Sequence, residues 1–347
     1  MRARPLACII AAVLLIPPVA CSPRAAEESV RVSREALGTV VTIEAWGADK
    51  TAVDRAIDDA FVAIADVERE LDAYSTTSSV SAFNKAPYRD QPLPPDAVEV
   101  LDAIDRLEVA EEFSPGLLAV VRLYDFPGSG RVPSAEELAL ATAAARAFVR
   151  TPQGTAHFER LADPDPRLDP GAALAPGLDF GGAAKGLALD RARDALHARG
   201  AVTAAIVSSG STTVTLGDKP DGEPWRVGVE DARQPGVVIA RAEWHGEAAL
   251  STSGDYQQFF ERDGVRYHHI LDPDTGRPAR GVRTLTVAGR ISGLESDILS
   301  TALFVRGREG ALAYARAHGV GLFLTDSEGR AHLAPAPADS GVLLSEE

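Results

Sequence analysis

The residues of this sequence best suited to chemistry begin with two adjacent histidines, His268 and His269, inside the stretch 251–279. An Asp263-Gly264 pair between two extended runs predicts a β-hairpin, and the second run contains both histidines. Successive side chains of a strand point to opposite faces, so only one of the two rings can face a given cleft. A histidine in a cleft suits proton transfer near neutral pH, and a hairpin with two surface histidines is the alternative.

A second chemically suited segment is 178–186, with the sequence LDFGGAAKG. Its two glycines let the backbone approach a ligand closely, and the helix expected after Lys185 would direct its positive end toward an anion. The segment lacks the order of a Walker A loop. Taken alone, it fits either an anion site or a glycine turn before an ordinary helix.

Two oxygen-bearing side chains, Asp297 and Thr301, stand four residues apart in a predicted helix that opens at Glu295. That spacing places them on one helical face. Carboxylate and hydroxyl oxygens suit a hard cation. The alternative is that Asp297 only stabilises the start of the helix.

The composition limits the partners of this chain. Its 347 residues are 45% hydrophobic and 24% charged, which is typical of a globular protein with a real core. The formal net charge of -15 argues against nucleic acid and against electrostatic binding to an anionic membrane. An anionic ligand would therefore need a bound cation, a well-placed Lys or Arg, or a helix N-terminus.

The N-terminus predicts secretion. Basic residues at positions 2 and 4 precede an apolar run over 6–16, which is too short to span a bilayer, and residues 1–20 are predicted to be a signal peptide. Ala20-Cys21 resembles the cleavage site of a bacterial lipoprotein, so residues 21–28 would form a lipidated tether. We therefore expect a lipoprotein of the bacterial cell envelope that faces the periplasm; ordinary secretion is the alternative, because Pro18 is atypical at its position.

Helical periodicity and alternation predict the elements that must position these residues. Helices are expected over 51–74, over 95–112, after a capping box at Ser134, after Gly186, from Glu295 and over 309–318, and loops over 75–85 and 113–130. Strands are expected over 30–46, 204–208, 212–216, 225–229, 238–244, 283–288, 320–324 and 332–333. Short turn-rich connections between strands favour a mainly antiparallel sheet.

Four motifs in one order resemble the ApbE family of flavin transferases, which are FAD:protein FMN transferases and often lipoproteins. The motifs are LDFGGAAKG, PDGEPWRVGVED over 220–231, STSGDYQQFF with HHILDPDTGRPA over 251–279, and ESDILSTALFVRG over 295–307. The resemblance implies an α+β fold of two interleaved α/β subdomains with a mainly antiparallel sheet and a cleft between them. It also implies a single flavin transferase domain over 29–340.

Site residues follow from the same resemblance. It implies a Mg²⁺ held by Gly182, Asp297 and Thr301, with Ser300 at a position where some members have another acid. It places His269 as the candidate general base, or as a residue that only orients the substrate. Its expected FAD contacts are Leu37, Tyr74, Tyr124, Asp125, Phe126, Asp179, Lys185 and Leu271.

The implied reaction transfers FMN from FAD to a threonine or serine hydroxyl of an acceptor flavoprotein, through a phosphodiester bond, and releases AMP. One alternative is an FAD pyrophosphatase that yields FMN and AMP. Another is a non-catalytic FAD-binding lipoprotein. The expected partners are FAD, the acceptor protein and, through Cys21, a membrane; nucleic acid is not expected.

Overall fold

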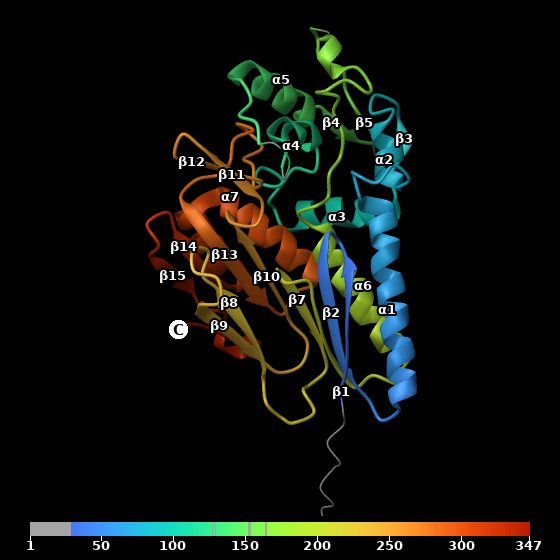
Figure 1. Cartoon of the computed structure of the whole chain (residues 1–347), viewed down its shortest axis with the longest axis vertical. Coiled ribbons are helices and arrows are strands. Elements are labelled where there is room, and N and C mark those ends of the chain that lie inside the picture. Colours follow the sequence, from blue (N-terminus) through green and yellow to red (C-terminus); the bar gives the residue numbers. More distant parts are fainter. Residues whose placement is uncertain (1–28, 127, 129, 152–153, 164) are drawn as a thin grey trace, which may run out of the picture.

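The computed structural model of the chain describes residues 29–347 except 127, 129, 152–153 and 164 (Figure 1). The predicted signal peptide, Cys21 and the tether lie outside the described residues. Within the part that is described, no helix is both long and apolar enough to cross a membrane.

A large antiparallel sheet forms the centre of the molecule (Figure 1). Its eight strands have the order β1-β2-β6-β7-β10-β13-β14-β15. They are β1 (Ser29–Ala36), β2 (Thr39–Trp46), β6 (Ala204–Ser208), β7 (Thr212–Leu216), β10 (Ala249–Gly254), β13 (Val282–Gly289), β14 (Gly321–Asp326) and β15 (Ala331–Ala334). The predicted strand 30–46 is thus a hairpin, whose turn residues Leu37 and Gly38 have φ of 56° and 66°.

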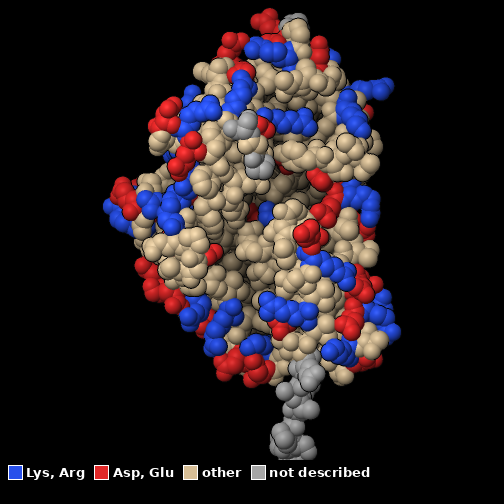
Figure 2. Space-filling model, viewed as in Figure 1, with Lys and Arg blue, Asp and Glu red and all other residues tan. Residues whose placement is uncertain are grey.

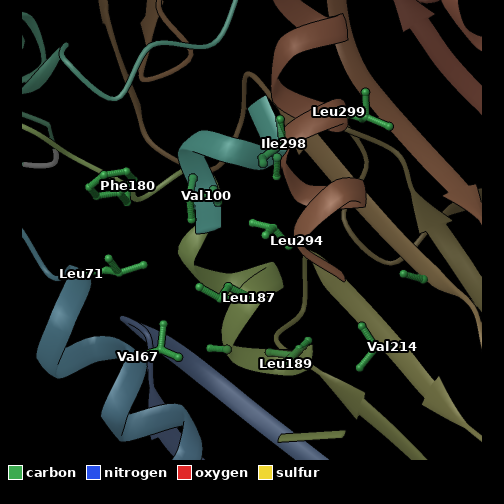
Figure 3. Close-up of a cluster of buried hydrophobic side chains, with 14 of the residues drawn as sticks. Val67, Leu71, Val100, Phe180, Leu187, Leu189, Val214, Leu294, Ile298 and Leu299 are labelled. Carbon is green, nitrogen blue, oxygen red and sulfur yellow. The ribbon is translucent and has the colours of Figure 1, made fainter. Parts of the chain in front are cut away.

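Three long helices pack together and against this sheet: α1 (Lys50–Leu71), α6 (Ala184–Ala198) and α7 (Gly293–His318). Asp49 begins α1 by accepting hydrogen bonds from the backbone N–H groups of Thr51 and Ala52. Apolar side chains of all three helices meet in the main core (Figure 3), where Leu71, Leu187 and Ile298 lie among residues buried almost completely.

A smaller antiparallel sheet covers another part of the large one and has the order β16-β9-β8. Its strands are β8 (Trp225–Glu230), β9 (Val238–Trp244) and β16 (Val342–Glu346). Trp225 and Trp244 are buried with Phe323 of the large sheet in a second core. The fold therefore continues past residue 340, because β16 pairs with β9.

A third group of elements lies beyond one end of the large sheet (Figure 1). It contains α2 (Ser79–Asn84), α3 (Pro95–Arg106), α4 (Leu118–Tyr124), α5 (Ala135–Arg146), β3 (Gln91–Pro92), β4 (Phe148–Arg150), β5 (Thr155–Phe158) and the hairpin β11 (Phe259–Arg262) with β12 (Val265–His268). The chain enters this group twice, after α1 and again after β10, so the two parts are interleaved. The predicted α+β class with mainly antiparallel sheet is confirmed.

Two predicted loops contain helices. The serine- and threonine-rich loop over 75–85 includes α2, where the side chain of Ser78 accepts a hydrogen bond from the backbone N–H of Ser81. The loop predicted over 113–130 includes α4, whose Leu123 and Tyr124 are buried in a third core with Leu138 and Leu271. Both helices are too short to form alone and depend on tertiary packing.

Candidate functional site

A pocket lies where the third group of elements meets the end of the large sheet, and the surface of the molecule is hollowed near its centre in Figure 2. Eight residues singled out from the sequence line the pocket: Tyr74, Asp179, Gly182, Lys185, His269, Leu271, Asp297 and Thr301. The fold thus brings together residues from segments more than 200 positions apart. We call the contact of α6 with α7 the floor of the pocket, and α4 with the hairpin β11–β12 its rim.

The floor depends on two glycines that face each other, Gly186 of α6 and Gly293 of α7. A Cβ atom on Gly186 would lie 2.2 Å from the carbonyl oxygen of Gly293. This close approach lets the Asp297 carboxylate accept a hydrogen bond of 2.9 Å from the backbone N–H of Gly186. The floor therefore fixes Asp297 from both helices.

Burial raises the pKa of Asp297, which is 5% exposed, although the nearby Lys185 ammonium and the Gly186 N–H act in the opposite direction. The hydroxyl of Thr212 also donates to Asp297, over 3.3 Å. A second positive charge beside this carboxylate would favour its ionised form. Asp297 is therefore a carboxylate that could hold a cation in the pocket.

A further buried carboxylate, Asp190 of α6, was missed in the sequence. It accepts hydrogen bonds of 2.9 Å from the backbone N–H groups of Gly293 and Leu294, at the start of α7. These N–H groups have no partner within the helix, so Asp190 satisfies them and fixes the helix that contains Asp297. An acid in the middle of a helical pattern gives no sign of this role in the sequence.

Thr301 lies one turn after Asp297 and shares a hydroxyl network with Ser253 of β10, over 3.1 Å. Ser300 is fully buried behind the pocket and bonds to Ser253 and to the backbone carbonyl of Asp297. Ser300 is not among the residues that line the pocket. Its contacts hold Ser253 and the helix, and its predicted metal contact stays a prediction.

The oxygens at the floor fit a magnesium ion. A Cβ atom on Gly182 would lie 3.8 Å from the methyl carbon of Thr301, so the glycine loop adjoins the Asp297–Thr301 face. Carboxylate, hydroxyl and carbonyl oxygens are the ligands that Mg²⁺ prefers. No group of three or more His, Cys, Asp or Glu residues suited to a metal occurs in the described chain. A cation here would need water and ligand oxygens to complete its shell.

The glycine loop is held by Asp179. Its carboxylate accepts hydrogen bonds of 2.9 Å from the Tyr74 hydroxyl and 2.9 Å from the backbone N–H of Gly181. Tyr74 is largely exposed as a residue, but desolvation of its hydroxyl inside the pocket, together with the negative charge of Asp179, raises the pKa of Tyr74. The Lys185 ammonium donates to the carbonyl oxygen of Gly181 over 3.3 Å. Lys185 forms no ion pair with the described residues, so its charge is available to a ligand.

His269 lies where the floor meets the rim. Its Nδ1 lies 3.2 Å from the carbonyl oxygen of Gln258, so we assign the proton to Nδ1 and a free lone pair to Nε2. Burial lowers its pKa to about 4, and the Lys185 ammonium acts in the same direction. The ring is therefore neutral at pH 7.

His268 points the other way, as the alternation of a strand requires. Its ring is 2% exposed and packs edge-on against Phe304, with centroids 5.7 Å apart. Its Nε2 lies 2.9 Å from the carbonyl oxygen of Ala279. The prediction that only one ring faces the cleft is confirmed, whereas the alternative of two surface histidines is wrong.

Four predicted contact residues do not line the pocket: Leu37, Tyr124, Asp125 and Phe126. Leu37 lies in the β1–β2 turn, where its N–H donates to Glu68 over 2.6 Å. Tyr124 stacks on Phe126 at 5.4 Å, and Phe126 packs on Phe260 of β11 at 5.5 Å. Asp125 ends α4 with φ of 55°. In this structure the last three belong to the support of the rim.

Other lining residues were not assigned a role from the sequence: Glu112, Phe113, Ser211, Thr252, Ser253, Gln257 and Gln258 among them. The last four lie in the STSGDYQQFF motif, so the motif could have identified them as pocket residues.

The Asp263-Gly264 turn of the hairpin has φ of 52° and 72°, as predicted for this pair.

The fold and the pocket define an α+β protein with a cleft in which apolar walls surround a few charged and hydroxyl groups, an arrangement suited to an anionic ligand and a hard cation. The sequence model that defines the ApbE family matches residues 37–324 of this chain. The chain is 30% identical over 280 residues to the FAD:protein FMN transferase of Vibrio cholerae, over 78% of this chain and 76% of that protein. It is 30% identical over 318 residues to that of Treponema pallidum, over 85% and 84%. The chain belongs to the ApbE family.

Solved structures agree with this assignment. The ApbE protein of Thermotoga maritima is similar with a TM-score of 0.75 and 27% identity, over 88% of this chain and 97% of that one. The flavin transferase ApbE of Vibrio cholerae gives 0.70 and 26%, over 92% and 97%. A match to the FAD:protein FMN transferase of Rhodobacter capsulatus, 45% identical over 132 residues, covers 38% of this chain and only 24% of that relative.

Proposed function

We propose that this chain transfers FMN from FAD to a threonine or serine hydroxyl of an acceptor protein and releases AMP, with Mg²⁺ as its cation. The observation that carries the proposal is the pocket in which Lys185, Asp297, Thr301 and His269 converge. Relatives named FAD:protein FMN transferase, matched over most of their length, support the same reaction.

The charge of the pocket favours a metal-dependent reaction. Among the described residues that line the pocket, Lys185 is the only Lys or Arg, against the carboxylates of Glu112, Asp179 and Asp297. Arg306 pairs with Glu112 through two contacts, which leaves two carboxylates and one ammonium. An FAD diphosphate would be repelled by this balance without a divalent cation. When bound, Mg²⁺ would supply charge neutralisation at the diphosphate, and Asp297, Thr301 and the Gly182 carbonyl would hold it.

In the proposed step the acceptor hydroxyl oxygen forms a bond to the FMN-side phosphorus, and the bond from that phosphorus to the bridging oxygen breaks. AMP leaves with the bridging oxygen, and FMN stays on the acceptor as a phosphodiester. Such a transfer asks little covalent chemistry of the protein, so positioning and charge dominate. Lys185 would bind a diphosphate oxygen, and Asp179 would hold the glycine loop.

In the proposed step His269 takes the proton of the attacking hydroxyl on Nε2, which the contact of Nδ1 with Gln258 leaves free. The hydrogen bond from Nδ1 to Gln258 fixes the ring and its tautomer. A diphosphate bound nearby would raise the pKa of His269 from its low value in the free pocket, which strengthens it as a base. The alternative is that the ring only orients the substrate.

One assay separates transfer from its alternatives. The purified chain is incubated with FAD, Mg²⁺ and a candidate acceptor domain, and the products are quantified by mass spectrometry and chromatography. Flavin covalently bound to the acceptor, with one AMP per flavin, is the expected result. Free FMN with AMP would indicate a pyrophosphatase, and unchanged FAD would indicate a non-catalytic binding protein. Either of the last two outcomes contradicts the proposal.

We further propose that Cys21 is the lipidated N-terminus that anchors the enzyme to a membrane of the cell envelope, facing the periplasm. The support is Ala20-Cys21 after a short apolar segment. Replacement of Cys21 by alanine should move the protein from the membrane to the soluble envelope fraction. Recovery of the natural chain in the soluble fraction with an unmodified Cys21 would contradict this.

A further inference from the structure

The hairpin β11–β12 forms a two-stranded sheet of its own beside the pocket. Its register pairs Phe259 with His268 and Glu261 with Arg266. The backbone N–H of His269 donates to the carbonyl oxygen of Gln258 over 3.1 Å. Because bonded and non-bonded pairs alternate along antiparallel strands, the backbone groups of Phe259 and Glu261 point away from β12.

The two outer edges of this hairpin differ. On the β12 edge, the guanidinium of Arg280 donates to the carbonyl oxygen of Arg266 over 2.8 Å. On the β11 edge, the outward backbone groups of Phe259 and Glu261 have no hydrogen-bond partner in the described part of the chain. The β12 edge is thus capped at Arg266 and buried at His268, which is 2% exposed, whereas the β11 edge carries no cap and Phe259 beside it is exposed. An open edge of this kind can pair with another extended segment.

The open edge leads into the pocket. Gln257 and Gln258, which precede β11, line the pocket together with His269. At about 3.3 Å per residue, a segment paired beside Glu261 reaches the level of Gln257 within about 13 Å. Phe259, at the pocket end of the edge, is 41% exposed under the guanidinium of Arg266. It offers an apolar contact next to the open hydrogen-bonding groups.

We propose that the acceptor protein docks on the outer edge of β11, as an added antiparallel or parallel strand that leads its hydroxyl to His269. The proposal rests on the proposed transfer, since a protein hydroxyl must reach the phosphorus in the pocket. The partner it fits is an extended segment with free main-chain groups and an apolar side chain that packs on Phe259. In this mode the backbone hydrogen bonds give affinity, and the side-chain contact gives selectivity.

Proline at position 261 provides the test, because it removes an outward N–H on an edge strand and leaves the ladder to β12 intact. Glu261→Ala is the matched control that removes the side chain and keeps the N–H. We expect Glu261→Pro to raise the KM for the acceptor domain about 5- to 10-fold, the value of one net hydrogen bond. The Kd for FAD, measured by flavin fluorescence, should stay unchanged, and Glu261→Ala should have a KM within about twofold of the natural chain.

A second measurement locates the contact directly on the natural chain. Amide hydrogen exchange of the FAD-loaded chain is compared with and without the acceptor domain. Protection should appear at residues 259–262 and should be absent from the outer edge of β12. Phe259→Ser should weaken that protection and leave the Kd for FAD unchanged.

The outcomes distinguish docking from transfer. The docking site alone is overturned if the natural chain transfers flavin but Glu261→Pro has an unchanged KM for the acceptor and residues 259–262 gain no protection. A natural chain that makes no flavinylated acceptor overturns the proposed function and the docking site with it. A concentration-dependent dimer that Glu261→Pro abolishes would assign the edge to a second copy of the chain and would also overturn the proposal.

Discussion

The floor and the rim of the pocket are built in different ways. The floor joins two helices at Gly186 and Gly293 and fixes Asp297 by buried hydrogen bonds. The rim is held by an aromatic cluster in which Phe260 stacks on Tyr267 at 5.1 Å, and it leaves Phe259 and one strand edge exposed. This difference matches the two proposed tasks, in which the fixed charge of the floor would bind the anionic ligand and the open edge of the rim would bind the acceptor protein.

The largest expected effect comes from the floor. Asp297→Ala removes the only carboxylate on the predicted metal face, so the transfer rate should fall more than about 100-fold. Loss of a residue that only orients a metal ligand typically costs about 10- to 100-fold, and loss of a ligand itself should cost more. Asp297→Asn keeps an acceptor for the Gly186 N–H and isolates the loss of charge, and Thr301→Ala should be milder because water can replace a hydroxyl. Initial rates over a Mg²⁺ titration, with a thermal melt of each variant, measure this. Asp297→Ala with natural turnover at ordinary Mg²⁺ would show that the metal face is misplaced.

The contact between the floor helices should be the next most sensitive point. In Gly186→Ala the new methyl group meets backbone 2.2 Å away, so α6 and α7 must separate. We expect the free energy of unfolding to fall by about 3 kcal/mol or more. Gly310→Ala is the control, because its methyl group would meet only the flexible side chain of Arg306. The free energies of unfolding of the two variants are compared by urea denaturation. Equal values for Gly186→Ala and Gly310→Ala would contradict a close contact between α6 and α7 at Gly186.

Acid should destabilise the protein through His268, which lies behind the rim. Burial lowers its pKa to about 4, so the unfolded chain binds the proton more readily and stability is lost as the pH falls from about 6.5 toward 4. Between pH 7 and pH 5 this loss should be about 2 kcal/mol. His268→Gln can still donate to Ala279 and should lose that part of the pH dependence. If the free energy of unfolding, measured in urea, falls equally with pH in the natural chain and in His268→Gln, His268 is not the source of the acid sensitivity.

The smallest effect is expected at the pocket entrance. Tyr74 is 61% exposed, and Tyr74→Phe removes one hydrogen bond to Asp179, which keeps its bond from Gly181. The Kd for FAD should rise no more than about fivefold, which corresponds to about 1 kcal/mol. Fluorescence titration measures it. A loss as large as that of Asp297→Ala would mean that the entrance, and not the floor, fixes the ligand.

Much of the fold could be predicted where local signals are strong. The strands over 204–208, 212–216 and 238–244 and the capping box at Ser134 occur as expected, because alternation and capping act within a few residues. Gly307 interrupts α7 between the two helices predicted there. The central strand β10, with the sequence ALSTSG, was not predicted. Its residues have little strand propensity, and it is a strand because it pairs with β7 on one side and β13 on the other.

The candidate site could be predicted in part for a related reason. Motif residues such as Lys185 and Asp297 meet in the pocket, since each motif supplies a turn or a helical face that fixes one side chain. Asp190 could not be found, because its role depends on where α7 begins in space. The open edge of β11 likewise appears only when the register of the hairpin and the position of Arg280 are known.

His269, which lies between floor and rim, is the proposed base for the acceptor's proton, and a single-turnover comparison tests this role most directly. With FAD bound in advance, AMP release in the presence of the acceptor is measured for the natural chain, His269→Ala and His268→Gln, together with the Kd for FAD. We predict a 10²- to 10⁴-fold slower release for His269→Ala, a typical cost of a lost general base, with little change in FAD affinity and a near-normal rate for His268→Gln. Equal losses in the two variants, or a His269→Ala protein that fails only because it no longer binds FAD, would contradict the role of His269 as the base.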